Sequence, residues 1–241
     1  MVSLQRYRLV VFDFDGTLAD SFPWFAGVIN GVADRYGFAR IAEHETETLR
    51  GMDARGIVRH LGIPAWKLPL ITRHMHRLAA RDIGGIRLFP GVPDLLADLD
   101  GAGLRLGIAS SNREATIRRA LGPAARHFTH YACGASLFGK ARRLRALIRD
   151  AGVAPSQALY IGDEIRDHQA ATEAGCAFGA VTWGYTRADA LAARTPEHLF
   201  ADPAAIGGSI VSALPQEIGN CPAPRPVGLP LARSARQVNV R

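Results

Sequence analysis

The chain has 241 residues, of which 48% are hydrophobic and 21% are charged, and its mean hydropathy is +0.02. These values exclude a disordered chain and a collagen-like chain. A chain of this length buries roughly 70–75% of its unfolded surface, so it folds without support from disulfides or a structural metal. We expect one large domain, or one domain with a modest insertion.

The net charge is +7, and arginine supplies almost all of the positive charge, with 27 Arg against two Lys, Lys67 and Lys140. We attribute this excess to biased base composition in the source genome. No basic stripe with interleaved aromatic residues is present, so we expect no nucleic-acid partner. A basic chain does attract anionic substrates by raising their local concentration.

The sequence carries no signal for a membrane or for export. No stretch approaches the ~20 apolar residues of a membrane-spanning helix, and the apolar run Leu9–Phe12 is too short for a signal peptide. Cys133, Cys176 and Cys221 are few, odd in number and without CxxC spacing, which favours free thiols in a reducing compartment. We therefore predict a cytoplasmic protein that does not bind membranes; the sequence carries no signal for an oligomeric state.

Short apolar runs that end at turn residues predict strands buried on both faces, as in a parallel sheet. The strongest runs are Leu9–Phe12, Leu104–Ala109 and Ala158–Ile161, and the weaker runs are Ala177–Thr182 and His198–Phe200.

Helical periodicity fills the intervals between these runs. The predicted helices are Asp94–Leu99, Arg113–Leu121, Ala141–Ala151 and Asp167–Ala174. Gly152 and Gly175 stand where C-terminal caps belong. Strands that alternate with helices imply right-handed crossovers, and therefore an α/β fold with a parallel sheet.

Residues 21–88 break this rhythm, because they contain helical patterns and no convincing strand. The patterns cover Trp24–Tyr36, Thr46–Leu61 and Leu68–Ala80. We predict an all-helical domain at 21–88, inserted into an α/β domain made of residues 1–20 and 89–214. Residues 215–241 hold five of the 14 prolines and an excess of Arg, and they are predicted to be a flexible basic tail.

Polar residues follow three of the predicted strands. Asp13 and Asp15 follow the first strand, Ser110 follows the second and Asp163 follows the third. In an open parallel sheet, ligands bind outside the carboxyl ends of the strands. Positions two apart on an extended backbone point the same way, so the carboxylates of Asp13 and Asp15 face one spot.

Two such carboxylates repel each other unless a cation or a shared proton offsets the repulsion. Carboxylate oxygens suit Mg²⁺, which takes one or two protein carboxylates together with a phosphate oxygen. Asp163 arrives from another strand and completes such a site. Asp167 lies one helical turn further on, where it binds the ion directly or supports another ligand.

These groups permit phosphoryl transfer. A carboxylate attacks phosphorus to form an aspartyl-phosphate, and a second carboxyl protonates the leaving oxygen and later deprotonates water. Ser110 is placed to donate a hydrogen bond to a phosphoryl oxygen, and Lys140 offsets negative charge. Mg²⁺ screens the phosphate from the aspartates.

Four motifs in order resemble the haloacid dehalogenase-like hydrolase superfamily, in the branch with a helical cap inserted after the first motif. They are Asp13-Phe14-Asp15-Gly16-Thr17, Leu106–Ser110, Gly139-Lys140 and Gly162–Asp167, which match DxDGT, a strand ending in Ser or Thr, the motif lysine and GDxxxD. The resemblance covers about residues 8 to 213. It implies a Rossmann-like core, and phosphoglycolate phosphatase is the member type with the most similar overall pattern.

The resemblance implies roles for the acids. Asp13 would be the nucleophile and a Mg²⁺ ligand, and Asp15 the general acid/base whose backbone carbonyl also binds the metal. Asp163 would be a metal ligand, and Asp167 would support the metal or Lys140.

The resemblance also assigns phosphate binding to Ser110 and Lys140. Ser110 and Ser111 are adjacent, and either fits the second motif; the length of the preceding strand favours Ser110, with the Ser111 backbone N–H as a second donor. Arg50, near the start of the second helix of the insertion, is a candidate for reading a substrate carboxylate or second phosphate. A solvated helix face is an equally favoured interpretation of Arg50.

The predicted function is Mg²⁺-dependent hydrolysis of a small phosphomonoester, either phosphoglycolate-like or a sugar phosphate. Asp15 argues against the family's dehalogenases and phosphonatases, which lack an acid at this position. Three alternatives remain: a sugar-phosphate mutase of β-phosphoglucomutase type, a pyrophosphatase or nucleotidase of the same fold, and a catalytically silent binding module.

Overall fold

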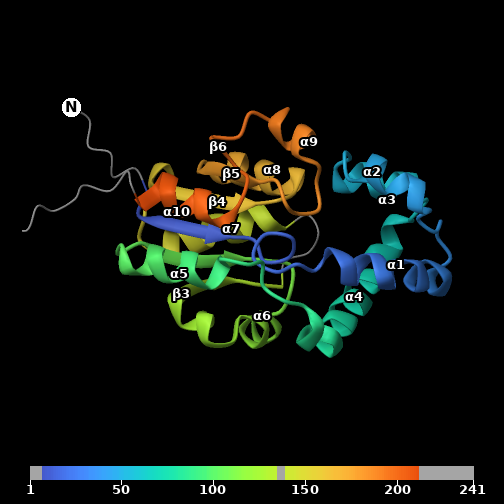
Figure 1. The fold of residues 1–241 in the computed structure, drawn as a ribbon. Coiled ribbons are helices and arrows are strands. Elements are labelled where there is room, and N and C mark those ends of the chain that lie inside the picture. Colours follow the sequence, from blue (N-terminus) through green and yellow to red (C-terminus); the bar gives the residue numbers. More distant parts are fainter. Residues whose placement is uncertain (1–6, 135–138, 212–241) are drawn as a thin grey trace, which may run out of the picture.

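The structure, a computed structural model, describes residues 7–134 and 139–211, so the tail predicted at 215–241 lies outside the described residues. Six parallel strands form one sheet in the order β3-β2-β1-β4-β5-β6. The strands are β1 Leu9–Phe12, β2 Arg105–Ala109, β3 Phe128–Ala132, β4 Ala158–Gly162, β5 Ala177–Val181 and β6 His198–Phe200. This arrangement confirms the predicted α/β class (Figure 1).

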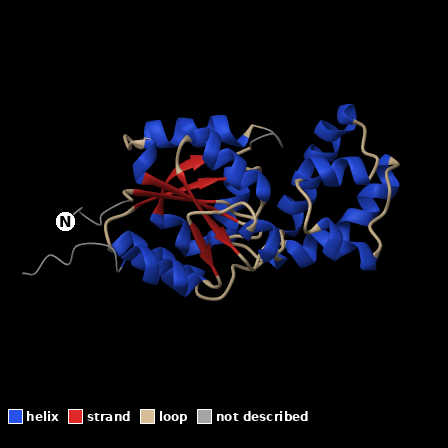
Figure 2. Cartoon of the chain, turned by 90° about the horizontal axis from the view of Figure 1, so that it is seen from above, coloured by secondary structure: helices blue, strands red, loops and turns tan. Residues whose placement is uncertain are grey.

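Helices cover both faces of the sheet (Figure 2). They are α5 Val92–Gly101, α6 Glu114–Leu121, α7 Lys140–Asp150, α8 Ile165–Ala174, α9 Ala188–Ala192 and α10 Pro203–Val211. Side chains alternate along a strand, so Val10 and Phe12 enter the core under α5, α6 and α10. Leu9 and Val11 enter the second core, under α7, α8 and α9. Two cores explain why β1 is a continuous apolar run.

The sequence patterns found five of the six strands and missed β3 and the last two helices. Strand β3 lies at the edge of the sheet, and Phe128 is its only fully buried residue, so it lacks the apolar run of an inner strand. Helix α10 contains Gly207 and Gly208, which disfavour a helix. It forms because Ile206 and Ile210 are buried in the core under α5.

Between β1 and α5, the described chain forms helices that lie beside the sheet as a separate lobe (Figures 1 and 2). They are α1 Phe22–Tyr36, α2 Thr46–Leu49, α3 Ala54–His60 and α4 Leu68–Asp82, with short 3-10 turns. The two connections to the sheet pair with each other: Asp20 N–H donates to the Arg87 carbonyl and Phe89 N–H to the Leu18 carbonyl.

The prediction of one helix over Thr46–Leu61 is wrong, because the chain breaks between α2 and α3. Asp53 has an extended backbone, and its side chain accepts a hydrogen bond of 2.7 Å from the Gly56 N–H. This N-cap starts a new helix at Ala54.

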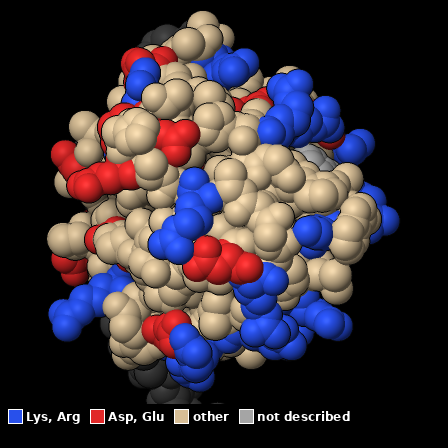
Figure 3. Space-filling view, turned by 90° about the vertical axis from the view of Figure 1, so that its right-hand side faces the viewer, with Lys and Arg blue, Asp and Glu red and all other residues tan. Residues whose placement is uncertain are grey.

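No helix in the ranges 7–134 and 139–211 has both the length and the apolar character needed to cross a membrane. On the face shown in Figure 3, Lys and Arg are dispersed among Asp, Glu and uncharged residues and are not gathered into one stripe.

Candidate active site

The loops that follow three adjacent strands meet at one edge of the sheet. Strand β1 lies between β2 and β4, so Asp13, Ser110 and Asp163 follow neighbouring strands. The chain passes from β1 to β2 on one side of β1, and later crosses from β3 to β4 on the other side of β1. A parallel sheet opens a ligand-binding crevice at such a switch point.

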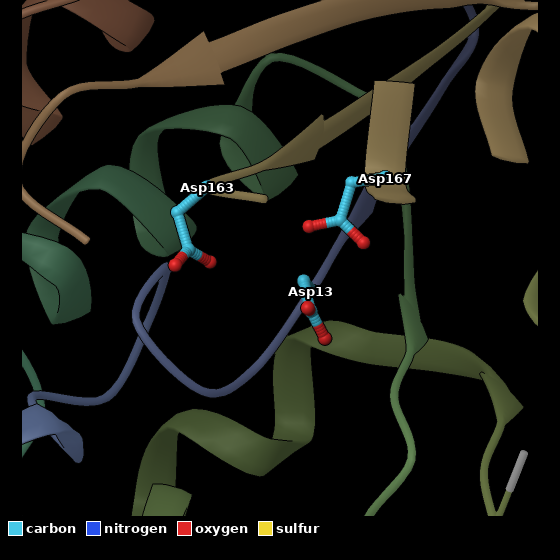
Figure 4. Close-up of side chains that lie close together, drawn as sticks. All are labelled: Asp13, Asp163 and Asp167. Atoms are coloured by element: carbon cyan, nitrogen blue, oxygen red, sulfur yellow. The ribbon is translucent and has the colours of Figure 1, made fainter. Parts of the chain in front are cut away.

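Three carboxylates converge at this point (Figure 4). One carboxylate oxygen from each of Asp13, Asp163 and Asp167 lies within 4.8 Å of the others. All three residues are at most 2% exposed. Buried carboxylates this close repel each other when ionised, unless a cation is present.

Lys140, the first residue of α7, pairs with two of these acids. Its Nζ donates to Asp13 Oδ2 at 2.7 Å and to Asp167 Oδ1 at 2.6 Å, and the lysine is 5% exposed. The Tyr160 hydroxyl also donates to Asp167 Oδ1, at 3.1 Å, and the Glu164 N–H donates to Oδ2. Asp167 is therefore held by three protein donors, one of which is the Lys140 ammonium.

Asp163 is held by neutral donors. Thr17 Oγ1 donates to Oδ1 and the Tyr185 N–H donates to Oδ2, both at 2.7 Å. Within the described chain no Lys or Arg forms an ion pair with this carboxylate. Gly16 and Gly184 pack directly against this side chain, and a Cβ added to either glycine would lie 2.2 Å from an Asp163 side-chain atom.

The donors fit a hard divalent cation. The local charge comes from four acids and two bases, namely Asp13, Asp163, Glu164, Asp167, Lys140 and Arg166. When all are ionised, the acids exceed the bases by two negative charges. Oxygen donors, burial and this excess suit Mg²⁺.

Asp15 lies outside the three-carboxylate cluster. Its Oδ2 accepts a 2.7 Å hydrogen bond from Asn112 Nδ2, in the loop after β2. Burial raises the pKa of Asp15 above its ordinary value. The side chain is thus set apart from the cluster, and burial shifts its pKa in the direction that suits a general acid.

Burial also raises the pKa of Asp13 to about 7, although the Lys140 ammonium opposes this shift. Burial raises the pKa of Asp163 well above its ordinary value. At Asp167 burial acts in the same direction, but Lys140 and Arg166 outweigh it and lower the pKa.

A divalent cation at this site would have to displace the proton that Asp13 retains below about pH 7, so its binding is expected to strengthen as the pH rises. Because burial also raises the pKa of Asp163, the apparent Kd for Mg²⁺ should fall by about tenfold or more per pH unit between about pH 5 and pH 7. Calorimetric titrations at several pH values, in buffers of different ionisation enthalpy, measure both the affinity and the protons released. A Kd independent of pH, with no proton release, would contradict this.

The predicted phosphate-binding residues lie at the same edge. Ser110 directly follows β2 and is fully buried, and its Oγ accepts a 3.2 Å hydrogen bond from the Asn112 N–H. Ser111 is half-buried. Both positions and Lys140 border the strand ends that carry Asp13 and Asp163.

Arg50, the candidate for reading a substrate carboxylate or second phosphate, contacts protein backbone. Its Nε donates to the Tyr185 carbonyl and its Nη2 to the Gly184 carbonyl, both at 3.0 Å. The sequence analysis missed Asn112 and Tyr185, the partners of Asp15 and Asp163. Asn112 follows Ser110 at a strand end and offered some signal, whereas nothing local distinguishes Tyr185.

Comparisons with known proteins agree with this geometry. The family described as haloacid dehalogenase-like hydrolase matches residues 10–181. A phosphoglycolate phosphatase of Synechococcus elongatus is 35% identical over 198 residues, covering 81% of this chain and 93% of that protein. The tyrosine-protein kinase PtkA of Mycobacterium tuberculosis is 32% identical over 192 residues, covering 76% of this chain and 64% of that protein.

A solved structure from Lactobacillus plantarum, assigned as a phosphoglycolate phosphatase, superposes with a TM-score of 0.72 at 27% identity. It covers 83% of this chain and 98% of that one. The family match spans most of the chain and includes the loops that carry Asp13, Ser110, Lys140 and Asp163. The chain therefore belongs to the haloacid dehalogenase-like hydrolases and is an enzyme of the phosphatase type within that family.

Proposed function

We propose that the protein is a Mg²⁺-dependent phosphatase that hydrolyses a small phosphomonoester of the phosphoglycolate type through an aspartyl-phosphate on Asp13. The observation that carries this proposal is the buried cluster of Asp13, Asp163 and Asp167 with Lys140 at hydrogen-bond distance from two of them. The similarity to the Synechococcus elongatus phosphatase supports the substrate class.

In the first step, a carboxylate oxygen of Asp13 attacks phosphorus while the bond from phosphorus to the substrate oxygen breaks. The departing oxygen takes the proton of Asp15, whose pKa is raised by burial. Lys140 stabilises negative charge at the attacked group, and Ser110 is placed at the same strand edge to donate to a phosphoryl oxygen.

In the second step, Asp15 takes a proton from water, and the water oxygen attacks the phosphorus of the aspartyl-phosphate. The bond from phosphorus to Asp13 breaks, which releases phosphate and restores both side chains. Asp13 and Asp163, with the Asp15 carbonyl and support from Asp167, would hold Mg²⁺, and the ion would neutralise the phosphate charge.

We further propose that residues 21–88 act as a cap on a core formed by residues 1–20 and 89–214, and that the protein works in the cytoplasm. A cavity of about 80 Å³ lies between the two parts. Asp53 and Arg55 line it from the helical side, and Lys140 and Arg166 from the α/β side.

A phosphate-release assay over a panel of phosphorylated metabolites, with and without Mg²⁺, tests this proposal. We expect phosphoglycolate or a similarly small phosphomonoester to be the best substrate, with activity lost in chelator. Formation of an isomerised sugar phosphate without free phosphate would identify a mutase instead. Absence of Mg²⁺-dependent turnover for every compound would contradict the proposal.

Asn112→Ala is expected to lower kcat/KM for phosphoglycolate, which reports the first step, by about tenfold or more, because Asp15 loses the donor that orients it. The loss of kcat/KM should be much smaller for p-nitrophenyl phosphate, whose leaving group needs no proton in that step. Steady-state kinetics with both substrates measure the difference. Asn30→Ala, which removes an asparagine of α1 that hydrogen-bonds the Ile41 backbone, serves as a control for general destabilisation. If Asn112→Ala lowered kcat/KM equally for the two substrates, a role of Asn112 through Asp15 would be contradicted.

A further inference from the structure

Arg50 joins the helical insertion to a loop of the α/β domain. It follows α2, and its guanidinium reaches the loop that follows β5. Nε donates to the Tyr185 carbonyl and Nη2 to the Gly184 carbonyl, both at 3.0 Å. Nη1 pairs with Glu47 at 2.8 Å. The Nε–Nη2 edge of the guanidinium, which could bind a carboxylate or phosphate in a bidentate way, is therefore occupied by backbone carbonyls.

The same loop holds Asp163 from its other side. The Tyr185 N–H donates to Asp163 Oδ2 at 2.7 Å, and the Thr186 N–H donates to the Asp163 carbonyl at 3.3 Å. Gly184 lies so close that an added Cβ would approach the Asp163 Cβ to 2.2 Å. Residues 184–186 thus form one wall around this carboxylate.

The helical insertion makes further contacts with residues 184–187. The Tyr185 ring packs edge-on against Phe22 and Phe25 of α1, with ring centroids 5.2 and 5.6 Å apart. The Tyr185 hydroxyl lies 3.1 Å from Ser21 Oγ. The Arg187 N–H donates to the Arg50 carbonyl at 3.0 Å. The loop is therefore clamped between the insertion and Asp163.

We propose that Arg50 is a positioning residue that acts through residues 184–186 on the orientation of Asp163. Contact between the insertion and the α/β domain thereby sets the affinity of the site for a divalent cation. The inference rests on the proposed function, in which Asp163 is a metal ligand. Removing a group that orients a ligand lowers metal affinity by about 10- to 100-fold.

The test is calorimetric titration of Mg²⁺ alone into the full chain and its variants. For Arg50→Ala we expect the Kd to rise by about tenfold or more, and for Arg50→Lys, which keeps one donor, by less. Arg40→Ala is the matched control, since this arginine of the insertion is exposed and pairs with exposed Asp34. Melting in chelator checks the fold, and Arg50→Gln replaces the alanine variant if that variant does not fold.

Three outcomes separate the possibilities. Arg50 variants that fold and bind Mg²⁺ as tightly as the wild type overturn the inference. The same result together with a raised KM for phosphoglycolate, but not for acetyl phosphate, would make Arg50 a substrate-binding residue. Asp163→Asn tests the underlying function separately, because unchanged Mg²⁺ binding in that variant would refute the metal site itself.

Discussion

Asp13→Asn is expected to lower kcat by about 10⁴-fold, because the amide cannot replace the carboxylate as a nucleophile. The variant should fold. Burial raises the pKa of Asp13 to about 7, so the wild-type site already accommodates the neutral acid in the absence of metal. Phosphate release measured with excess Mg²⁺ and substrate gives the change directly.

The control for Asp13→Asn is Asp34→Asn, which changes an exposed cap acid and should leave kcat unaltered. Both variants should melt within a few degrees of the wild type in chelator. Activity retained to within about tenfold in Asp13→Asn would show that another group attacks phosphorus.

Lys140→Met should lower both stability and activity. The substitution leaves two buried carboxylates without their cation, and breaking a buried pair in this way costs about 3–5 kcal/mol. We expect this loss of unfolding free energy in chelator at pH values where the acids ionise, and a smaller loss at acidic pH. Loss of charge stabilisation should also lower kcat by about 10²- to 10³-fold.

The double variant Lys140→Met with Asp167→Asn distinguishes these two effects. Removing one of the unpaired charges should restore part of the stability, whereas activity should remain low. Denaturant unfolding in chelator and steady-state kinetics give the two quantities. A Lys140→Met protein as stable as the wild type would show that the lysine does not compensate the carboxylates of Asp13 and Asp167.

The strand ends that carry the site could be predicted because each combines two strong local signals. Leu9–Phe12 is apolar on both faces, and Asp13 and Asp15 follow it without a gap. The parallel order of the strands then brings Asp13 and Asp163 to one edge, as the carboxylate cluster shows.

Features that depend on tertiary contacts could not be predicted in this way. Strand β3 buries only Phe128 fully, so it has no periodic signal, and α10 depends on packing of Ile206 and Ile210. The backbone carbonyls that accept from Arg50 lie 134 and 135 residues away in the sequence, and no local pattern indicates them.

The central claim is that Asp13 becomes phosphorylated, and mass spectrometry of an Asp15→Asn variant tests it most directly. Acetyl phosphate has a leaving group that needs no acid, so the first step should proceed while hydrolysis of the intermediate is slowed. After exposure to acetyl phosphate and Mg²⁺ followed by acid quenching, we predict one added phosphoryl group on the peptide that contains Asp13, removed by hydroxylamine. Turnover without any labelled peptide, or a label on a different residue, would contradict the account.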